Sequence, residues 1–186
     1  MLKLSRGEDM KNVLIISSSP RKISNSDMLC REFEKGAKEA GHHVDYVRLS
    51  DEKIGYCIGC YSCHKTGKCF QNDSMTELRE KIMNADVIVF ATPVYFYTMS
   101  AQLKTFIDRF TPFYEDVRAD IYIFATAWDS NLDNLQNTVE AVRGLTRDCL
   151  EDCEEKGVVC VGGLSGIGDI AGRSELKTAY EMGKNC

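Results

Sequence analysis

The chain has 186 residues, of which 44% are hydrophobic and 27% are charged, as is usual for a globular domain with a substantial core. Its formal net charge of −5 argues against nucleic acid or an anionic membrane as the main partner. No apolar run reaches the ~18 residues needed to cross a bilayer, and residues 1–12 lack the apolar centre of a signal peptide.

These features predict one domain over residues 11–186 of a cytoplasmic protein. Residues 1–10 are expected to be a disordered or leader segment, and Met10 is as suitable a start as Met1. Without a secretory signal, the nine cysteines are expected to be thiols or metal ligands, not disulfides. Five are scattered and are expected to be small buried hydrophobes: Cys30, Cys149, Cys153, Cys160 and Cys186.

The first predicted strand, 13–17, ends in a hydroxyl-rich, cationic loop that leads directly into a predicted helix, 24–40. The first N–H groups of a helix are unpaired and attract anions. The loop is not a Walker A sequence, and it lacks the glycines of a dinucleotide fingerprint, which favours the phosphate of a mononucleotide. Its candidate donors are Ser17, Ser18, Ser19, Arg21, Ser24, Asn25 and Ser26. The alternative is a capping loop that binds nothing.

A second strand is predicted at 44–49, after Gly41 ends the first helix. Its residues alternate between apolar and polar, which is typical of an edge strand. The other predicted strands (86–91, 120–126 and 157–162) are dense in β-branched and aromatic residues, as expected for strands buried on both faces.

Four cysteines gather in the loop at 50–73, with gaps of two, two and five residues: Cys57, Cys60, Cys63 and Cys69. Three interpretations stay open. Four close thiolates can wrap a 4Fe–4S cluster, because each iron needs one sulfur. The thiols can equally be unliganded in a packed loop, or hold a structural zinc, although zinc sites usually pair two distant knuckles.

Further helices are predicted from Ser74 with a capping box to Glu77, from Ser100, over 132–154, and from Ser174. Strands that alternate with helices predict a doubly wound α/β fold with a five-stranded parallel sheet, which binds ligands beyond the carboxyl ends of its strands. The stretch 166–171 satisfies G-x-G-x-x-A, but too little chain follows it for a dinucleotide fold. We interpret it as a loop.

The loop 92–97 follows the central strand and is rich in aromatic residues. A flat, amphipathic ligand needs such walls, together with backbone groups that Pro93 can hold in place. The alternative is a loop packed under its neighbour or a subunit contact, since exposed aromatics often mark interfaces.

At this point the chain resembles the flavodoxin-like NAD(P)H-dependent flavin reductases, and within them the iron–sulfur flavoprotein branch. The motifs that carry the resemblance are Ser18–Lys22, Ser24–Ser26, Thr92–Tyr95, Ser100–Lys104 with Asp108-Arg109, and Gly168–Ile170 with Ala179-Tyr180 and Gly183-Lys184. The four-cysteine run resembles the compact cysteine motif of that branch. The family usually has glycine where Ser18 stands.

The resemblance implies the strand order 2-1-3-4-5 and a bound FMN. The loop at 17–26 would hold the phosphate, and the isoalloxazine would lie along Thr92, Pro93, Val94, Tyr95 and Phe96, with Ala127 and Trp128 nearby. Backbone N–H groups of the 93–97 loop would stabilise negative charge on the ring, and no side chain is nominated as catalytic.

The function expected from this resemblance is electron transfer from NADH or NADPH through FMN to a quinone, flavin, metal ion or redox protein. The alternatives are an iron–sulfur flavoprotein electron carrier that serves ferredoxin-like partners, and a thiol-based sensor. Aromatic residues at 95–97 and 113–114 suggest a homodimer or homotetramer.

Overall fold

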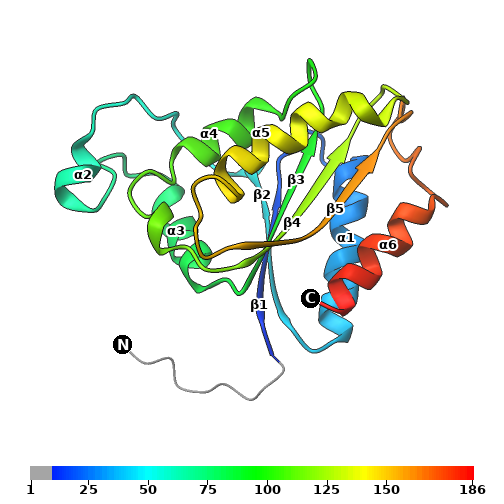
Figure 1. Cartoon of the computed structure of the whole chain (residues 1–186), viewed down its shortest axis with the longest axis horizontal. Coiled ribbons are helices and arrows are strands. Elements are labelled where there is room, and N and C mark those ends of the chain that lie inside the picture. The colour runs from blue at the N-terminus through cyan, green and yellow to red at the C-terminus, as the bar shows by residue number, and fades with distance from the viewer. Residues whose placement is uncertain (1–9) are drawn as a thin grey trace.

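Five parallel strands form one sheet in the order β2-β1-β3-β4-β5, between two layers of helices (Figure 1). The computed structural model describes residues 10–186; the expected leader, apart from Met10, lies outside them. The strands are β1 (Asn12–Ser17), β2 (His43–Arg48), β3 (Val87–Pro93), β4 (Asp120–Thr126) and β5 (Glu154–Val161). The doubly wound fold, its strand order and the edge position of β2 are confirmed.

The helices are α1 (Asn25–Glu39), α2 (Ser62–Thr66), α3 (Met75–Asn84), α4 (Ala101–Asp108), α5 (Gln136–Thr146) and α6 (Ser174–Lys184). Short 3₁₀ segments lie at Leu49–Asp51, Tyr114–Asp116 and Leu132–Leu135. No helix in residues 10–186 has the length and apolar character that a membrane crossing requires.

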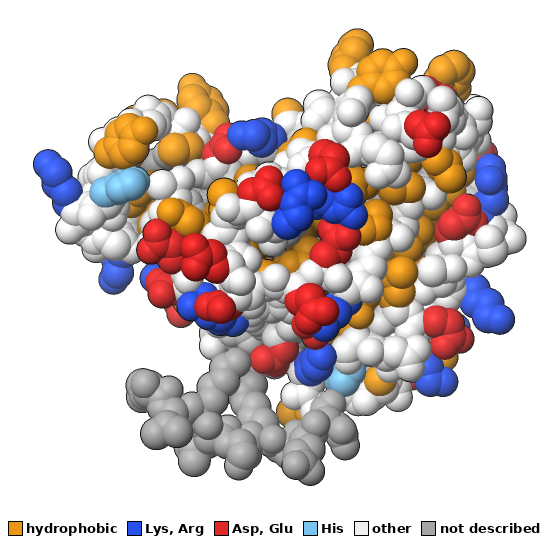
Figure 2. Space-filling view, in the orientation of Figure 1, with side chains coloured by type: hydrophobic (Ala, Val, Ile, Leu, Met, Phe, Trp, Pro, Cys, Tyr) orange, Lys and Arg blue, Asp and Glu red, His pale blue; other side chains and the backbone are white. Residues whose placement is uncertain are grey.

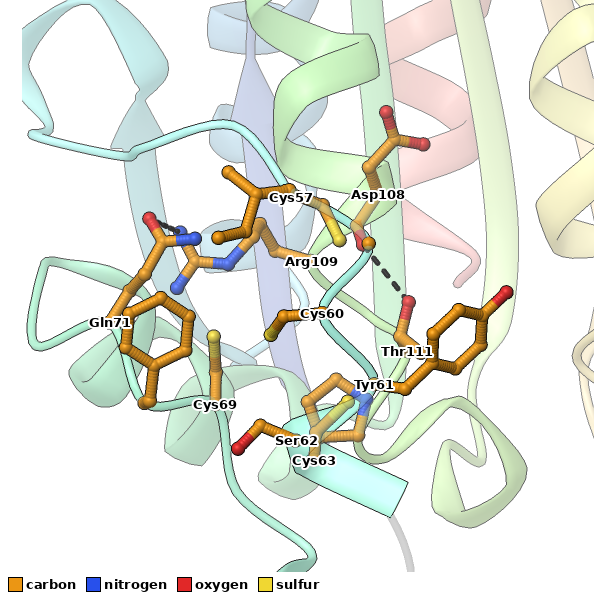
Figure 3. A pocket seen from close by; sticks show the side chains of 14 residues that line it. Cys57, Cys60, Tyr61, Ser62, Cys63, Cys69, Gln71, Asp108, Arg109 and Thr111 are labelled. Atoms are coloured by element: carbon orange, nitrogen blue, oxygen red, sulfur yellow. Dashed lines mark hydrogen bonds between the residues drawn. The ribbon is translucent and has the colours of Figure 1, made fainter. Parts of the chain in front are cut away.

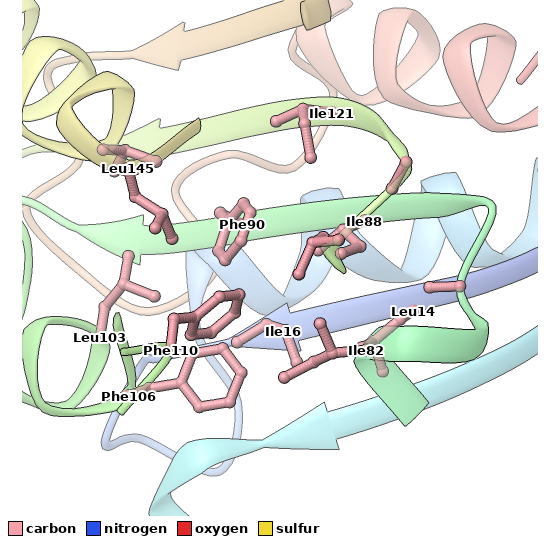
Figure 4. Close-up of a cluster of buried hydrophobic side chains, with 14 of the residues drawn as sticks. Leu14, Ile16, Ile82, Ile88, Phe90, Leu103, Phe106, Phe110, Ile121 and Leu145 are labelled. Carbon is pink, nitrogen blue, oxygen red and sulfur yellow. The ribbon is translucent and has the colours of Figure 1, made fainter. Parts of the chain in front are cut away.

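Each face of the sheet has its own apolar core, because side chains of a buried parallel strand alternate between the two faces. On one face, Leu14, Ile16 and Phe90 pack against α3, α4 and α5 (Figure 4). On the other, Ile15 and Phe124 pack against α1 and α6.

Helices α1 and α6 approach so closely that their crossing admits only glycine. A Cβ added to Gly183 would lie 2.0 Å from the carbonyl oxygen of Phe33, and one added to Gly36 would lie 2.1 Å from that of Tyr180. Both distances are far below van der Waals contact. The first and last helices of the described chain are therefore joined backbone to backbone.

The predicted helix over 132–154 is wrong at both ends. Its first residues, Leu132–Leu135, form a 3₁₀ segment. Helix α5 then ends at Thr146, and residue 154 is already the start of β5. Leu150 is buried in the core and turns the chain back toward the sheet. Glu154, which the sequence predicts as the end of this helix, and Glu155 form the exposed start of the edge strand β5, where Glu155 pairs with Arg143.

The predicted capping box at Ser74 is also wrong. Ser74 has helical backbone angles, and its hydroxyl accepts a hydrogen bond from the N–H of Lys53 instead. The cap is Asp73, whose carboxylate accepts from the N–H of Met75.

Candidate functional site

Loops that follow β1, β3 and β4 meet at the carboxyl edge of the sheet, as the doubly wound fold requires. The Ser26 and Thr126 hydroxyls are 2.7 Å apart, which joins the start of α1 to the end of β4. The N–H of Val94 donates to Thr126 O at 2.8 Å. The loops after β1, β3 and β4 therefore lie beside one another.

Most hydroxyls of the loop after β1 are already bonded within the protein. Ser17 and Ser24 both donate to the Asp27 carboxylate, at 2.5 and 3.0 Å, and Ser18 donates to Ala91 O at 2.9 Å. The sequence suggested all of these hydroxyls as donors to a ligand. In the structure these bonds hold the loop on the sheet.

Other donors of this loop are unengaged. The Ser19 hydroxyl accepts a hydrogen bond from the N–H of Arg21, and its own O–H group donates to no residue of the described chain. The Arg21 side chain is exposed. At the start of α1, the N–H groups of Asn25 and Ser26 make no hydrogen bond within residues 10–186, whereas that of Asp27 is capped by Ser24. These groups are therefore donors without a partner in the described chain, all within residues 19–26.

The Asn25 side chain ties this loop to the chain after β5. Its amide donates to Gly166 O at 2.9 Å, and its oxygen accepts from Gly168 N and Ile170 N. The segment 166–171 is a loop, as expected, and it leads into α6.

Sequence reasoning missed a buried polar network behind the loop. Asp27 accepts hydrogen bonds from Tyr46 and from Arg48, both at 2.8 Å, in addition to the two serines. Burial, together with nearby Cys30 and Asp27, raises the pKa of Tyr46, so its hydroxyl stays a donor. The sequence does contain a signal for this network. Ser24 and Asp27 have the spacing of a capping box, and the predicted edge strand 44–49 carries polar side chains that can reach it.

The Ser18 side chain is held in place by a second serine, Ser100, at the start of α4. Ser100 Oγ donates to Ser18 Oγ at 2.9 Å and caps α4, while its N–H donates to the buried Thr92 hydroxyl at 3.0 Å. The Ser18 side chain therefore points into the protein, and it leaves the outer side of the loop open.

The loop after β3 makes a tight turn. Tyr95 and Thr98 exchange two backbone hydrogen bonds, and Phe96 and Tyr97 between them have positive φ angles of 49° and 63°. Such angles are uncommon for bulky residues and mark constrained loops. From Val94 to Thr98, the N–H groups of Phe96 and Tyr97 have no hydrogen-bond partner within the described chain, whereas the other three are bonded internally.

Exposed aromatic side chains surround this turn. Phe96 is 99% exposed and Trp128 is 76% exposed, with Tyr95 and Tyr97 beside Phe96. Figure 2 shows hydrophobic side chains gathered along this upper edge of the molecule. Ala127, by contrast, is buried and donates its N–H to Val161 O.

The four clustered cysteines lie in the loop 50–73, which forms a lobe beside the sheet. They line one cavity of about 160 Å³ (Figure 3). Within this loop, Tyr61 and Gly67 bracket the one-turn helix α2 with left-handed backbone angles. All nine cysteines are free thiols. Within residues 10–186, no three His, Cys, Asp or Glu side chains lie close enough together to hold one metal ion. Four soft donors spread around a cavity fit an iron–sulfur cluster by number and chemistry.

A buried ion pair anchors both ends of this lobe. Arg109, at the end of α4, donates to Asp73 at 2.6 and 3.1 Å and to Gly55 O at 2.6 Å, and its side chain is 2% exposed. Burial would raise the pKa of Asp73, but hydrogen bonds from Arg109 and from two backbone N–H groups hold it below its usual value. Sequence analysis names Arg109 as part of a family motif and does not predict this ion pair.

The five other cysteines differ in environment. Cys30 is buried, and burial raises its pKa and those of the partly buried Cys153, Cys160 and Cys186. Cys149 is exposed, so its expected burial is wrong; it lies beyond the end of α5.

The family model described as NADPH-dependent FMN reductase matches residues 11–138. An iron–sulfur flavoprotein of Archaeoglobus fulgidus is 40% identical over 104 residues, which are 56% of this chain and 47% of that protein. One of Methanosarcina thermophila is 39% identical over 94 residues, 50% of this chain and 49% of its own length. These matches span about half of each relative.

Among solved structures, the NAD(P)H:quinone oxidoreductase from Methanothermobacter marburgensis superposes with a TM-score of 0.71 at 21% identity. The match covers 95% of this chain and 96% of that one. At this identity the likeness shows the fold.

Proposed function

Because the chain belongs to the NADPH-dependent FMN reductase family, we propose that residues 11–186 form one FMN-binding oxidoreductase unit that transfers electrons from NADH or NADPH to an acceptor. The observation that carries this proposal is the loop after β1. It carries unengaged N–H groups at the start of α1, the Ser19 hydroxyl and the exposed Arg21 side chain within one short segment.

In this proposal the phosphate binds to Ser19, Arg21 and the backbone N–H groups at the start of α1. The side chains of Ser17, Ser18, Ser24, Asn25 and Ser26 hold the loop in shape through their internal bonds. Binding is therefore mainly a backbone contact, supplemented by one guanidinium.

The flavin ring would lie along Thr92–Phe96, with Ala127 and Trp128 close to it. The aromatic side chains exclude water from one side of the ring, and the N–H groups of Phe96 and Tyr97 can donate to its oxygen and nitrogen atoms. When bound, FMN accepts a hydride from the nicotinamide and supplies the electrons to the acceptor, a quinone, flavin, metal ion or redox protein.

We expect the purified protein to bind FMN at least about tenfold more tightly than riboflavin, because one charged, multiply bonded phosphate contributes at least ~1.4 kcal/mol. Fluorescence quenching during titration measures both affinities. Arg21→Met should narrow the difference, whereas Arg143→Met, on α5, should not. Equal affinities for the two flavins in the unaltered protein would refute the proposal.

A second candidate function is that of an iron–sulfur flavoprotein electron carrier, and the cavity lined by four thiols favours it. Cys57, Cys60, Cys63 and Cys69 would hold a 4Fe–4S cluster, which supplies one-electron transfer when bound. Lys65 and Lys68, in the same loop, would partly offset its negative charge.

Anaerobically purified protein is expected to contain roughly four iron atoms per chain. Cys60→Ser should lose most of this iron, since it removes one of the four ligands, and Cys149→Ser should keep it, because Cys149 is an exposed thiol outside the lobe. Iron and sulfide assays measure both. An iron-free native protein, or equal iron in the two variants, would refute the iron–sulfur carrier, and the flavin oxidoreductase would be the remaining proposal.

The exposed aromatics around Phe96 also support a homodimer or homotetramer, in which the partner covers the flavin edge. Analytical ultracentrifugation would measure the oligomeric state.

A further inference from the structure

We propose that Arg48, at the end of the edge strand β2, is the positioning residue that turns the backbone of the phosphate loop toward its ligand. This inference rests on the proposed FMN function and adds a residue to it that does not touch the ligand.

The Arg48 guanidinium is fully committed to the protein. One terminal nitrogen donates to Lys22 O and to Asp27, both at 2.8 Å, and the other donates to Arg21 O at 2.6 Å and to Ser50 Oγ at 3.4 Å. Its Nε lies 3.5 Å from the Asp51 carboxylate. A side chain bonded in this way cannot also point at a ligand.

Two of these contacts determine the direction of peptide planes. In a trans peptide the C=O of one residue and the N–H of the next point in opposite directions, and residues 10–186 contain no cis peptide. Because Arg48 draws the carbonyls of Arg21 and Lys22 toward itself, the N–H groups of Lys22 and Ile23 face away from it. Neither N–H has a hydrogen-bond partner within the described chain.

Arg48 is itself held by Asp27, which stands in the first turn of α1 and accepts from Ser17 and Ser24 as well. One carboxylate therefore links the end of β1, the helix cap and the guanidinium. Because the hydroxyls of Ser17 and Ser24 are committed to Asp27, oriented N–H groups are the main donors of the loop left for an anion, beside Ser19 and Arg21. The direction of the peptides then governs affinity for the phosphate.

The test compares FMN with riboflavin, which differ in the phosphate. Arg48→Lys keeps the positive charge beside Asp27, but one ammonium cannot reproduce the fork that spans both carbonyls. We expect FMN affinity to fall about tenfold while riboflavin affinity is unchanged, as for the loss of one charge-assisted contact. Arg143→Met is the matched control: it removes an arginine held by Glu140 and Glu155, far from the loop.

An Arg48→Lys protein with the unaltered ratio of the two affinities, or with both affinities lowered equally, would overturn the inference. If that variant does not fold, hydrogen–deuterium exchange on the native protein decides. FMN, but not riboflavin, should then slow exchange at the amides of Lys22 and Ile23. Unprotected amides at these two positions would also overturn it. If the native protein does not prefer FMN over riboflavin, the proposed function itself fails, which is a separate outcome.

Discussion

Gly183→Ala is expected to lower the free energy of unfolding by about 3 kcal/mol, the largest effect we foresee from adding a single methyl group. The added Cβ would lie 2.0 Å from Phe33 O, and backbone cannot move aside as a flexible side chain can. Relief requires α1 and α6 to separate, which opens the apolar core between them. Urea unfolding of both proteins measures the difference.

The control is Gly144→Ala, on the exposed side of α5, where an added Cβ meets nothing within 4 Å. Alanine is favoured over glycine inside a helix by roughly 0.5–1 kcal/mol, so this variant should be slightly more stable than the native protein. Equal effects of the two substitutions would contradict the close crossing of α1 and α6.

Arg109→Met should destabilise the protein by about 3 kcal/mol at neutral pH, since it leaves the Asp73 carboxylate without its charged partner. The side chains of Arg109 and Asp73 are only 2% and 15% exposed, so water cannot replace the lost contacts fully. The variant should also loosen the cysteine lobe, because Gly55 and Asp73 lose their common anchor. Faster reaction of the clustered thiols with a thiol reagent would report this loosening.

The pH dependence of this effect has a definite sign. Asp73 has a lowered pKa when folded, so its contribution to stability is complete above its unfolded pKa of about 3.9 and is lost as the pH falls through the folded value. The stability difference between the native protein and Arg109→Met should therefore shrink in acid. Arg143→Met, which breaks a more exposed pair, should cost about 1 kcal/mol or less. A difference for Arg109→Met that does not vary with pH would exclude Asp73 as the cause.

The sequence was sufficient for the sheet because its signals are local and redundant. Buried parallel strands are almost continuously apolar, and the alternation of 44–49 placed β2 at an edge. It failed over 132–154, where an acidic run is equally compatible with a solvated helix end and with an exposed strand. The pairing of Glu154 and Glu155 with β4, which only the folded chain shows, decides between them.

For the candidate site, the sequence located the loops and not their internal bonding. Which edge of the sheet carries the loops follows from strand direction alone. Whether a serine donates to a ligand or to Asp27 depends on distances of a few ångströms between segments far apart in the chain. For the same reason the sequence does not predict the contacts of Arg48 and Arg109. Each donates hydrogen bonds to residues that only folding brings beside it.

The backbone contact between α1 and α6 has a consequence for biosynthesis. A ribosome releases residues 25–39 early, yet the surface that covers Phe33 is completed only when residues 174–184 have emerged. Until then the apolar residues of α1 around Phe33 are available to chaperones or to other nascent chains. We infer that the sheet reaches its final stability late in translation, and that C-terminal truncations before residue 174 would yield aggregation-prone polypeptides.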